Sequence, residues 1–171
     1  MRVGLGVPKK AEPGTGMNYV VEVMTTEPWV TLNADGRPGE RLARAWSWDA
    51  DGKVLRLKLR KDVVFHDGTP LTAKIAATAI RDMLVAPENA FIASFKTVGS
   101  VDVDGDDTVI LRMPEPNSFL LEDLSYGSVT MKKDKQQIGT GPFVPALVND
   151  QHAELRAFPR YYRGRPALDE I

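Results

Sequence analysis

The stretch that decides the fold reads LKLRKDVVFHDGTPLTA and occupies residues 57–73. It extends an alternation in which Leu55, Leu57 and Leu59 are separated by basic residues, as is typical of a β-strand with one buried face. Its Asp-Gly-Thr-Pro segment predicts a tight turn, because glycine permits positive φ and proline fixes φ. Thr72 is the predicted N-cap of a helix whose apolar residues recur on one face.

Hairpins and helices are predicted outward from this stretch. The predicted hairpins span residues 43–61, 101–113 and 143–158. The predicted helices span residues 17–26, 72–84, 88–95 and 117–124, and short strands are expected at 2–7 and 29–32. Because these elements do not alternate as βαβ units, we predict an α+β fold. The residues expected in the core around the central helix are Leu55, Leu57, Leu59, Ile80, Met83, Val109 and Leu111.

Composition excludes several classes of protein. The 171 residues include 22 Lys+Arg and 23 Asp+Glu, for a net charge of -1, and 43% are hydrophobic. This balance argues against intrinsic disorder and leaves no basic footprint for nucleic acid. No apolar run approaches the ~20 residues of a membrane-spanning helix. The chain has no cysteine, which excludes disulfides, cysteine–zinc sites and thiol nucleophiles within it.

No motif of an enzyme or a metal site is complete. Lys9 stands where a dinucleotide fingerprint requires its third glycine, and Met113 stands at the twelfth position of an apparent calcium loop. His66 and His152 have no partner at ligand spacing, so structural or surface roles are expected for them. We therefore predict no enzymatic activity, no cofactor and no metal site.

The segment at residues 42–73 resembles the signature of the family 5 extracellular solute-binding proteins, the peptide and nickel receptors of ABC importers. Other segments resemble the family in the same order along nearly the whole chain. They are residues 2–6, residues 27–30 followed by 35–38, and residues 139–143 followed by 160–166. Turn chemistry accounts for the most recognisable motif, residues 67–70, so we expect that motif to be architectural and not to contact ligand.

The resemblance implies a periplasmic-binding-protein fold of type II, in the large, three-domain class. Family members are much longer than this chain, so the resemblance implies an N-terminal fragment. The implied division is a partial start of lobe I at 1–28, an inserted α+β domain at 29–138 and a partial return to lobe I at 139–171, with lobe II absent. Residues 8–13 replace the family's usual Leu-Asp-Pro, which leaves peptide, nickel chelate, sugar and opine open as ligands.

The function implied by the resemblance is that of the substrate-binding component of an ABC importer. Such a receptor captures a small solute or peptide by hinge closure and delivers it to membrane permease subunits. We expect the full-length protein to be periplasmic or extracellular and membrane-associated, although this chain contains no signal peptide. The alternative is the ligand-sensing domain of a cytoplasmic transcriptional regulator, and the gene upstream of Met1 discriminates between the two.

The candidate ligand contacts come from the positions that face the cleft in this family. They are Thr15, Met17, Tyr19, Phe91 and Tyr126. The competing interpretation is helix packing for Met17 and Tyr19, and a place in the core for Phe91. We also expect the 171 residues alone to bind ligand weakly and to self-associate non-natively, because unpaired strand edges invite pairing with another chain.

Overall fold

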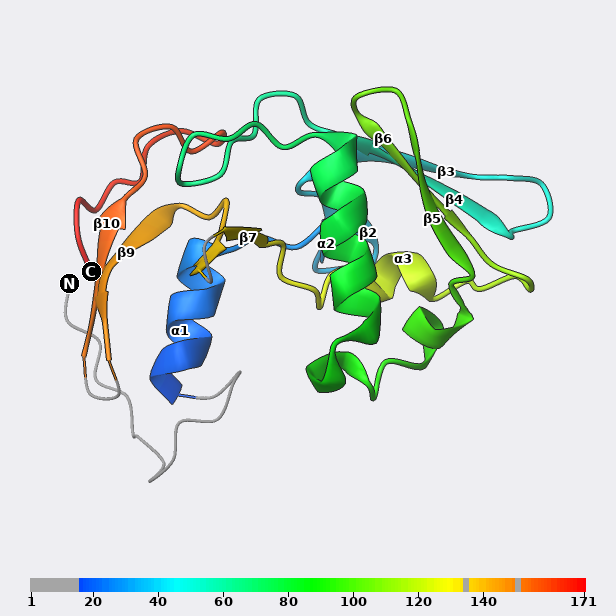
Figure 1. The fold of residues 1–171 in the computed structure, drawn as a ribbon, viewed down its shortest axis with the longest axis horizontal. Coiled ribbons are helices and arrows are strands. Elements are labelled where there is room, and N and C mark those ends of the chain that lie inside the picture. Colours follow the sequence, from blue (N-terminus) through cyan, green and yellow to red (C-terminus); the bar gives the residue numbers. More distant parts are fainter. Residues whose placement is uncertain (1–15, 134–135, 150–151) are drawn as a thin grey trace.

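The computed structural model describes residues 16–133, 136–149 and 152–171. These residues form two parts joined side by side (Figure 1). The larger part holds helix α2 and a four-stranded sheet, and the smaller part holds helix α1 and the β9–β10 hairpin. The predicted strand at residues 2–7 and the candidate contact Thr15 lie outside the described residues.

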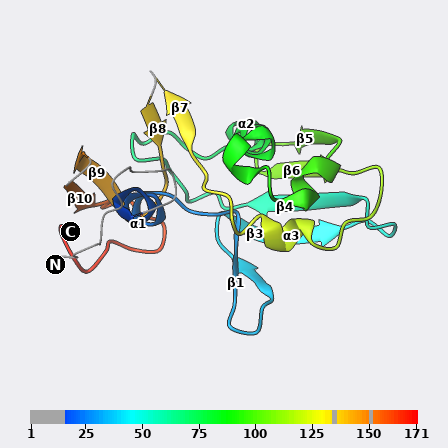
Figure 2. The same ribbon diagram turned by 90° about the horizontal axis from the view of Figure 1, so that it is seen from below.

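An antiparallel sheet with strand order β3-β4-β6-β5 forms the centre of the larger part. Its strands are β3 (Ala43–Trp48), β4 (Val54–Leu59), β5 (Ser100–Asp104) and β6 (Thr108–Arg112). The pairings Leu55–Leu111 and Leu57–Val109 place apolar side chains on one face. Helix α2 (Ala73–Val85) covers this face (Figure 2). Both central hairpins are confirmed, and all seven residues predicted for the core are buried.

Helix α2 begins where its sequence predicted. The Thr72 hydroxyl accepts a hydrogen bond from the backbone N–H of Ile75 at 3.3 Å, which satisfies one of the free donors at the helix start. Ala76, Ile80 and Met83 are buried on the face toward the sheet. With 13 residues α2 is the longest of the described helices, and none of these is long and apolar enough to cross a bilayer.

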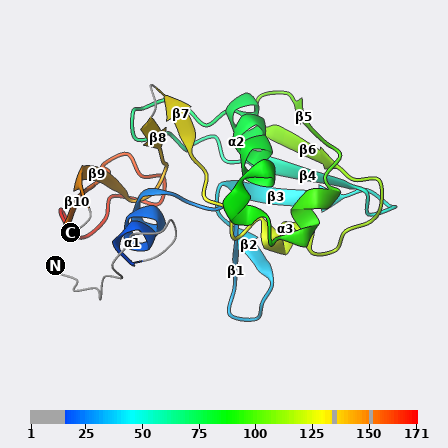
Figure 3. The ribbon, with the colours of Figure 1, turned by 60° about the horizontal axis from the view of Figure 1, so that its bottom comes forward.

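Helix α1 (Gly16–Thr25) packs against the hairpin of β9 (Phe143–Val148) and β10 (Ala153–Ala157). Figure 3 shows this part at the opposite end of the molecule from β5. A helix of 10 residues is marginal in isolation, and its valines disfavour it further, so packing on the hairpin stabilises it. Leu155 and Ile171 exchange two backbone hydrogen bonds, at 3.0 and 2.9 Å, which add the end of the chain to β10.

Two short hairpins complete the fold. The first pairs β1 (Val30–Leu32) with β2 (Pro38–Glu40), and the second pairs β7 (Met131–Lys133) with β8 (Gln136–Ile138). Only β1 was predicted. The other three strands have no apolar alternation, because they are short and largely half-buried or exposed.

The predicted helix at residues 88–95 is wrong. Two short 3₁₀ helices, Pro87–Asn89 and Ala93–Thr97, stand in its place. Ala86 is extended before proline, and the Asn89 side chain donates to the carbonyl of Met83 at 2.9 Å. A polar side chain that satisfies a neighbouring turn in this way competes with helix formation.

The predicted helix at residues 117–124 is too long. Only α3 (Leu120–Asp123) is helical. The Asn117 side chain accepts from the N–H of Phe119 at 3.0 Å and donates to the Thr97 hydroxyl at 2.8 Å. These bonds hold the residues before α3 in a turn instead of a helix.

Candidate functional site

The turn at residues 67–70 connects the sheet to α2 and is accounted for by its local bonds. Gly68 has φ of +88°, in the region that favours glycine. The Asp67 carboxylate accepts from the N–H of Thr69 at 2.9 Å. Lys133 Nζ lies 2.8 Å from its second oxygen, and this hydrogen bond holds the pKa of Asp67 at about 2. These contacts explain the residues of this motif as those of a stabilised turn.

His66 joins this turn to residues 139–141. Its backbone N–H donates to the carbonyl of Gly139 at 3.0 Å, and its ring Nε2 lies 3.0 Å from the carbonyl of Gly141. Burial lowers the pKa of the imidazole below its ordinary value of 6.5. A neutral ring with its proton on Nε2 can donate to this carbonyl. The structural role expected for His66 is confirmed.

Gly139 and Gly141 allow the same segment to lie against the end of α1. A Cβ added at Gly139 would lie 1.9 Å from the carbonyl oxygen of Thr25, and one at Gly141 would lie 2.5 Å from the Thr25 carbonyl carbon. The Gly141 N–H donates to that oxygen at 3.0 Å. Side chains at these positions would collide with backbone, so close approach explains both glycines.

Glu27 is a buried carboxylate, 4% exposed, between α1 and β1. The hydroxyls of Tyr161 and Tyr162 both donate to it, the second at 2.5 Å, and Arg41 Nη1 lies 3.5 Å from Oε1. Burial, followed by the hydrogen bond to Glu27, raises the pKa of both tyrosines. Burying a charge without such partners would be costly, so this cluster acts as a unit.

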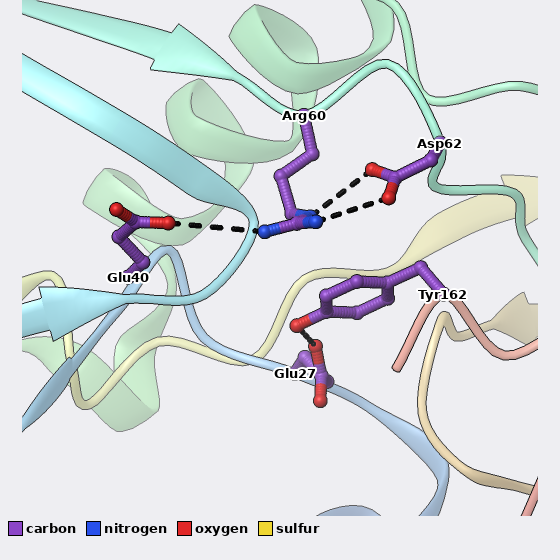
Figure 4. A network of polar contacts seen from close by, with 5 residues as sticks. All are labelled: Glu27, Glu40, Arg60, Asp62 and Tyr162. Atoms are coloured by element: carbon purple, nitrogen blue, oxygen red, sulfur yellow. Dashed lines mark hydrogen bonds and ion pairs between the residues drawn. The ribbon is translucent and has the colours of Figure 1, made fainter. Parts of the chain in front are cut away.

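Arg60 extends this network into the larger part of the molecule (Figure 4). Its guanidinium lies 4.8 Å from the ring centroid of Tyr162 and donates twice to Asp62, both times at 3.0 Å. This bidentate contact lowers the pKa of Asp62. An open hollow of about 540 Å³ lies beside Arg60. Its lining is charged and largely paired within itself, which is the character of an ion-pair network and not of an apolar ligand pocket.

These contacts bring together four segments that are distant in sequence. We call the group Glu27, His66, Gly139–Gly141 and Tyr161–Tyr162 the domain junction. Each member belongs to a segment that resembles family 5. The recognisable motifs therefore meet at one place, where they hold the larger part of the molecule against α1 and the β9–β10 hairpin.

Three of the candidate ligand contacts are exposed aromatic side chains. Tyr19 is 55% exposed, Phe91 79% and Tyr126 65%. We call these three residues the aromatic surface. Phe91 is thus not part of the core, and Tyr19 is not packed under a neighbouring element. Met17 is half-buried on α1, so part of its side chain is packed and part is exposed to solvent.

A hydrogen bond places the Tyr126 segment beside α1. The Ser128 hydroxyl donates to the Glu22 carboxylate at 2.6 Å. Tyr19 stands three residues before Glu22, on the same face of the helix. The structure therefore brings the segments that carry Tyr19 and Tyr126 together.

The Phe91 loop lies at the same end of α2 as the Tyr126 segment. A Cβ added at Gly127 would lie 1.9 Å from the sulfur of Met83, so Gly127 touches the last turns of α2. Asn89, two residues before Phe91, donates from its side chain to the carbonyl of Met83 in the same turns of α2. In Figure 1 this end of α2 and the start of α1 lie on one side of the molecule.

Sequence reasoning missed other exposed apolar residues and the central junction residue. Val23, Val85 and Phe119 are exposed but were not among the candidates. Exposure of an apolar residue has no local signature, because the same residue in a helix pattern predicts burial. Glu27 was recognised only as part of a motif, since its phenolic partners are 134 and 135 residues away.

The aromatic surface suits stacking and apolar contact, with two phenolic hydroxyls for hydrogen bonds. In the part of the chain that the structure describes, no group of three or more His, Asp or Glu side chains is placed to hold a metal ion.

Residues 37–171 match the bacterial extracellular solute-binding proteins, family 5, in the middle region of that family. The match covers well over half of the chain, which therefore belongs to this family. The fold is that of the type II periplasmic-binding proteins. An ABC transporter substrate-binding protein from Sinorhizobium meliloti has a TM-score of 0.81 at 23% identity, covering 91% of this chain and 34% of its own. The predicted fold class and family are confirmed.

Relatives with higher identity bind different solutes. NikA from Brucella suis, in complex with Fe(III)-EDTA, has a TM-score of 0.77 at 28% identity over 88% of this chain and 33% of its own. The nickel-binding periplasmic protein of Escherichia coli (strain K12) is 29% identical over 86% of this chain and 31% of its own. A putative ABC transporter peptide-binding protein of Brucella ovis is 28% identical over 76% and 28%. The chain spans about a third of the length of these relatives.

Proposed function

We propose that these residues belong to the solute-capturing receptor of an ABC importer. The observation that carries this proposal is membership of family 5 over residues 37–171. Relatives named for nickel binding and for peptide binding support it. In this proposal the protein acts by binding, without catalysis, in the periplasm or outside the cell, and delivers its solute to a membrane permease.

Within that receptor, we propose that the aromatic surface forms one wall of the ligand site, together with Met17 and Thr15. Its three aromatic residues are 55–79% exposed, so they can cover only one side of a bound solute. A small-molecule site, in contrast, encloses ~70–90% of its ligand. An open wall of this kind requires an opposite wall. Since relatives are about three times as long, the opposite wall would come from a second lobe that closes about a hinge.

The division into lobe I segments (1–28 and 139–171) and an inserted domain (29–138) is part of this proposal. The two parts of the molecule and the domain junction between them support it. The β7–β8 hairpin ends the inserted segment and is tied to it, because Lys132 Nζ lies 3.1 Å from the carboxylate of Asp82 on α2.

Thermal-shift screening of the complete gene product tests the receptor role. The probes are a set of di- and tripeptides and Ni(II) with L-histidine, which represent the two solute classes named among the relatives. We expect one class to raise the melting temperature, because a ligand that binds only the native state stabilises it. No stabilisation by either class would contradict a receptor for these solutes.

Calorimetry with the stabilising probe then tests the site. Tyr19→Ala, Phe91→Ala and Tyr126→Ala should each weaken binding by about tenfold, equivalent to ~1.4 kcal/mol. Phe119→Ala is the matched control, because Phe119 is an equally exposed aromatic residue outside the aromatic surface. Wild-type affinity in all three variants would show that the ligand binds elsewhere.

A further inference from the structure

We infer that Glu27 is a positioning residue for the ligand site. Its buried carboxylate holds the inserted domain at one angle to α1 and so sets the spacing between Tyr19 and the other two rings of the aromatic surface. The link to ligand affinity rests on the proposed function. The positional role rests on the contacts of the domain junction alone.

Glu27 contacts several of the segments whose relative position sets this spacing. It follows the last residue of α1 by two positions. Its carboxylate meets Arg41 of the inserted domain and the two tyrosines that follow β10. Its backbone carbonyl accepts from the N–H of Val129 at 2.9 Å, three residues after Tyr126. One residue thus ties α1, the inserted domain and the segment of the aromatic surface to each other.

The carboxylate accepts hydrogen bonds from two phenols and faces a guanidinium. Tyr161 donates to Oε1, which also faces Arg41, while Tyr162 donates to Oε2. Loss of the carboxylate leaves two phenols and a guanidinium without their acceptor in a buried site. Unsatisfied buried donors are costly, so the surrounding segments would shift until they find other partners or water.

A second set of contacts keeps such a variant folded. The hydrogen bonds of His66 to residues 139–141, and of Gly141 to Thr25, do not involve Glu27. Glu27 is also not among the residues that form the hydrophobic core of the inserted domain. Removal of the Glu27 carboxylate should therefore change the angle between the two parts without unfolding either.

Distance measurement between paired spin labels tests the positional role without any ligand. Labels at Val23→Cys on α1 and Val85→Cys on α2 use exposed positions, and no native cysteine in these 171 residues competes for the label. In the complete gene product with Glu27 intact we expect one narrow distance distribution. Glu27→Ala should broaden or shift it, and Glu27→Gln should do so less, because the amide oxygen still accepts from one phenol.

The control is Glu115→Ala, which removes an exposed carboxylate paired with Lys53 at 3.4 Å and should leave the distribution unchanged. If Glu27→Ala does not fold, Tyr162→Phe replaces it, since this change removes one donor and keeps the ring. An unchanged distribution in folded Glu27→Ala or Tyr162→Phe overturns the inference, whether or not a solute binds.

Calorimetry on the same variants tests the functional half, with Ni(II)–L-histidine and the di- and tripeptide set as probes. Glu27→Ala should bind about fivefold more weakly, with Glu27→Gln in between and Glu115→Ala unchanged. Altered spacing with unaltered affinity would overturn the role of Glu27 in ligand binding. Altered spacing in a protein whose wild type binds no probe would contradict the proposed function and support the positional role.

Discussion

The domain junction and the aromatic surface differ in almost every physical respect. The junction is largely buried, and its polar groups are tied by hydrogen bonds across segments up to 135 residues apart. The aromatic surface is open to solvent, on residues that belong to no motif. The difference teaches that the motifs resembling the family lie where the two parts of the molecule are held together. The residues proposed to contact the solute belong to no recognisable sequence motif.

A physical reason underlies this division. Close backbone approach and a satisfied buried charge admit few residue types, so glycine and glutamate at such places are recognisable. An exposed ring that stacks on a ligand can be replaced by many side chains when the ligand changes. The junction therefore explains why these motifs resemble the family, and the motifs do not identify the solute.

The largest expected effect is on solute affinity, when the aromatic surface is tested without the proposed opposite wall of the site. These 171 residues alone should bind the solute of the complete protein about a thousandfold more weakly, which corresponds to ~4 kcal/mol of lost contacts and closure. Calorimetry with both proteins measures this. Equal affinity would place the whole site within these residues.

Light scattering on the same 171-residue sample tests the expected self-association. Leu147 and Val148 of β9 are exposed, and strands that lack neighbours pair with other chains. A strictly monomeric sample at high concentration would contradict this expectation.

Glu27→Ala should be the most destabilising single change at the junction. We expect the free energy of unfolding to fall by about 3–5 kcal/mol, because buried partners lose their charge complement. Glu115→Ala, at an exposed ion pair, should change it by less than ~1 kcal/mol. Urea unfolding of both variants measures the difference, and similar values would remove the distinction between junction and surface.

Gly141→Ala should cost less, about 1–3 kcal/mol, through overpacking against the Thr25 backbone. Gly105→Ala is the matched control. Gly105 has φ of +63° with nothing within 4 Å of an added Cβ, so it should cost only ~1 kcal/mol of backbone strain. If both variants unfold at the same urea concentration, close approach is not what requires glycine at the junction.

Truncation of the aromatic surface should hardly affect stability. Tyr19→Ala, Phe91→Ala and Tyr126→Ala should each change the free energy of unfolding by about 0.5 kcal/mol or less, since little area is buried on these rings. Thermal and urea unfolding give this value. A loss of several kcal/mol would show that a ring is part of the packing after all.

The smallest effect concerns pH. Because burial lowers the pKa of His66 in the folded state, the unfolded state binds a proton first, and stability falls as the pH drops through 6.5. Asp67 and Asp107, with pKa values of about 2, do not titrate in that range. The melting temperature should therefore decrease between pH 7.5 and 5.5, and His66→Gln should show a flatter profile. Identical slopes would exclude His66 as the cause.

Alternation, turn residues and helix capping allowed several elements to be predicted from the sequence. Alternating leucines predicted β4, the turn at residues 67–70 and Thr72 predicted the start of α2, and the ordered motifs predicted the family. These features depend on neighbours within a few residues, where periodicity and capping act. The strands β2, β7 and β8 and the 3₁₀ helices were missed or misread, because side-chain bonds and packing override weak local preference there.

Only the tertiary structure decided what the motifs are for. Glu27 accepts hydrogen bonds from the hydroxyls of Tyr161 and Tyr162, and Gly141 packs on the backbone of Thr25. Both contacts join residues more than a hundred positions apart. The exposure of Phe91 likewise follows from how α2 ends and where the following loop is held. A sequence determines which side chains prefer burial, but which groups meet is set by the closure of long loops around a shared core.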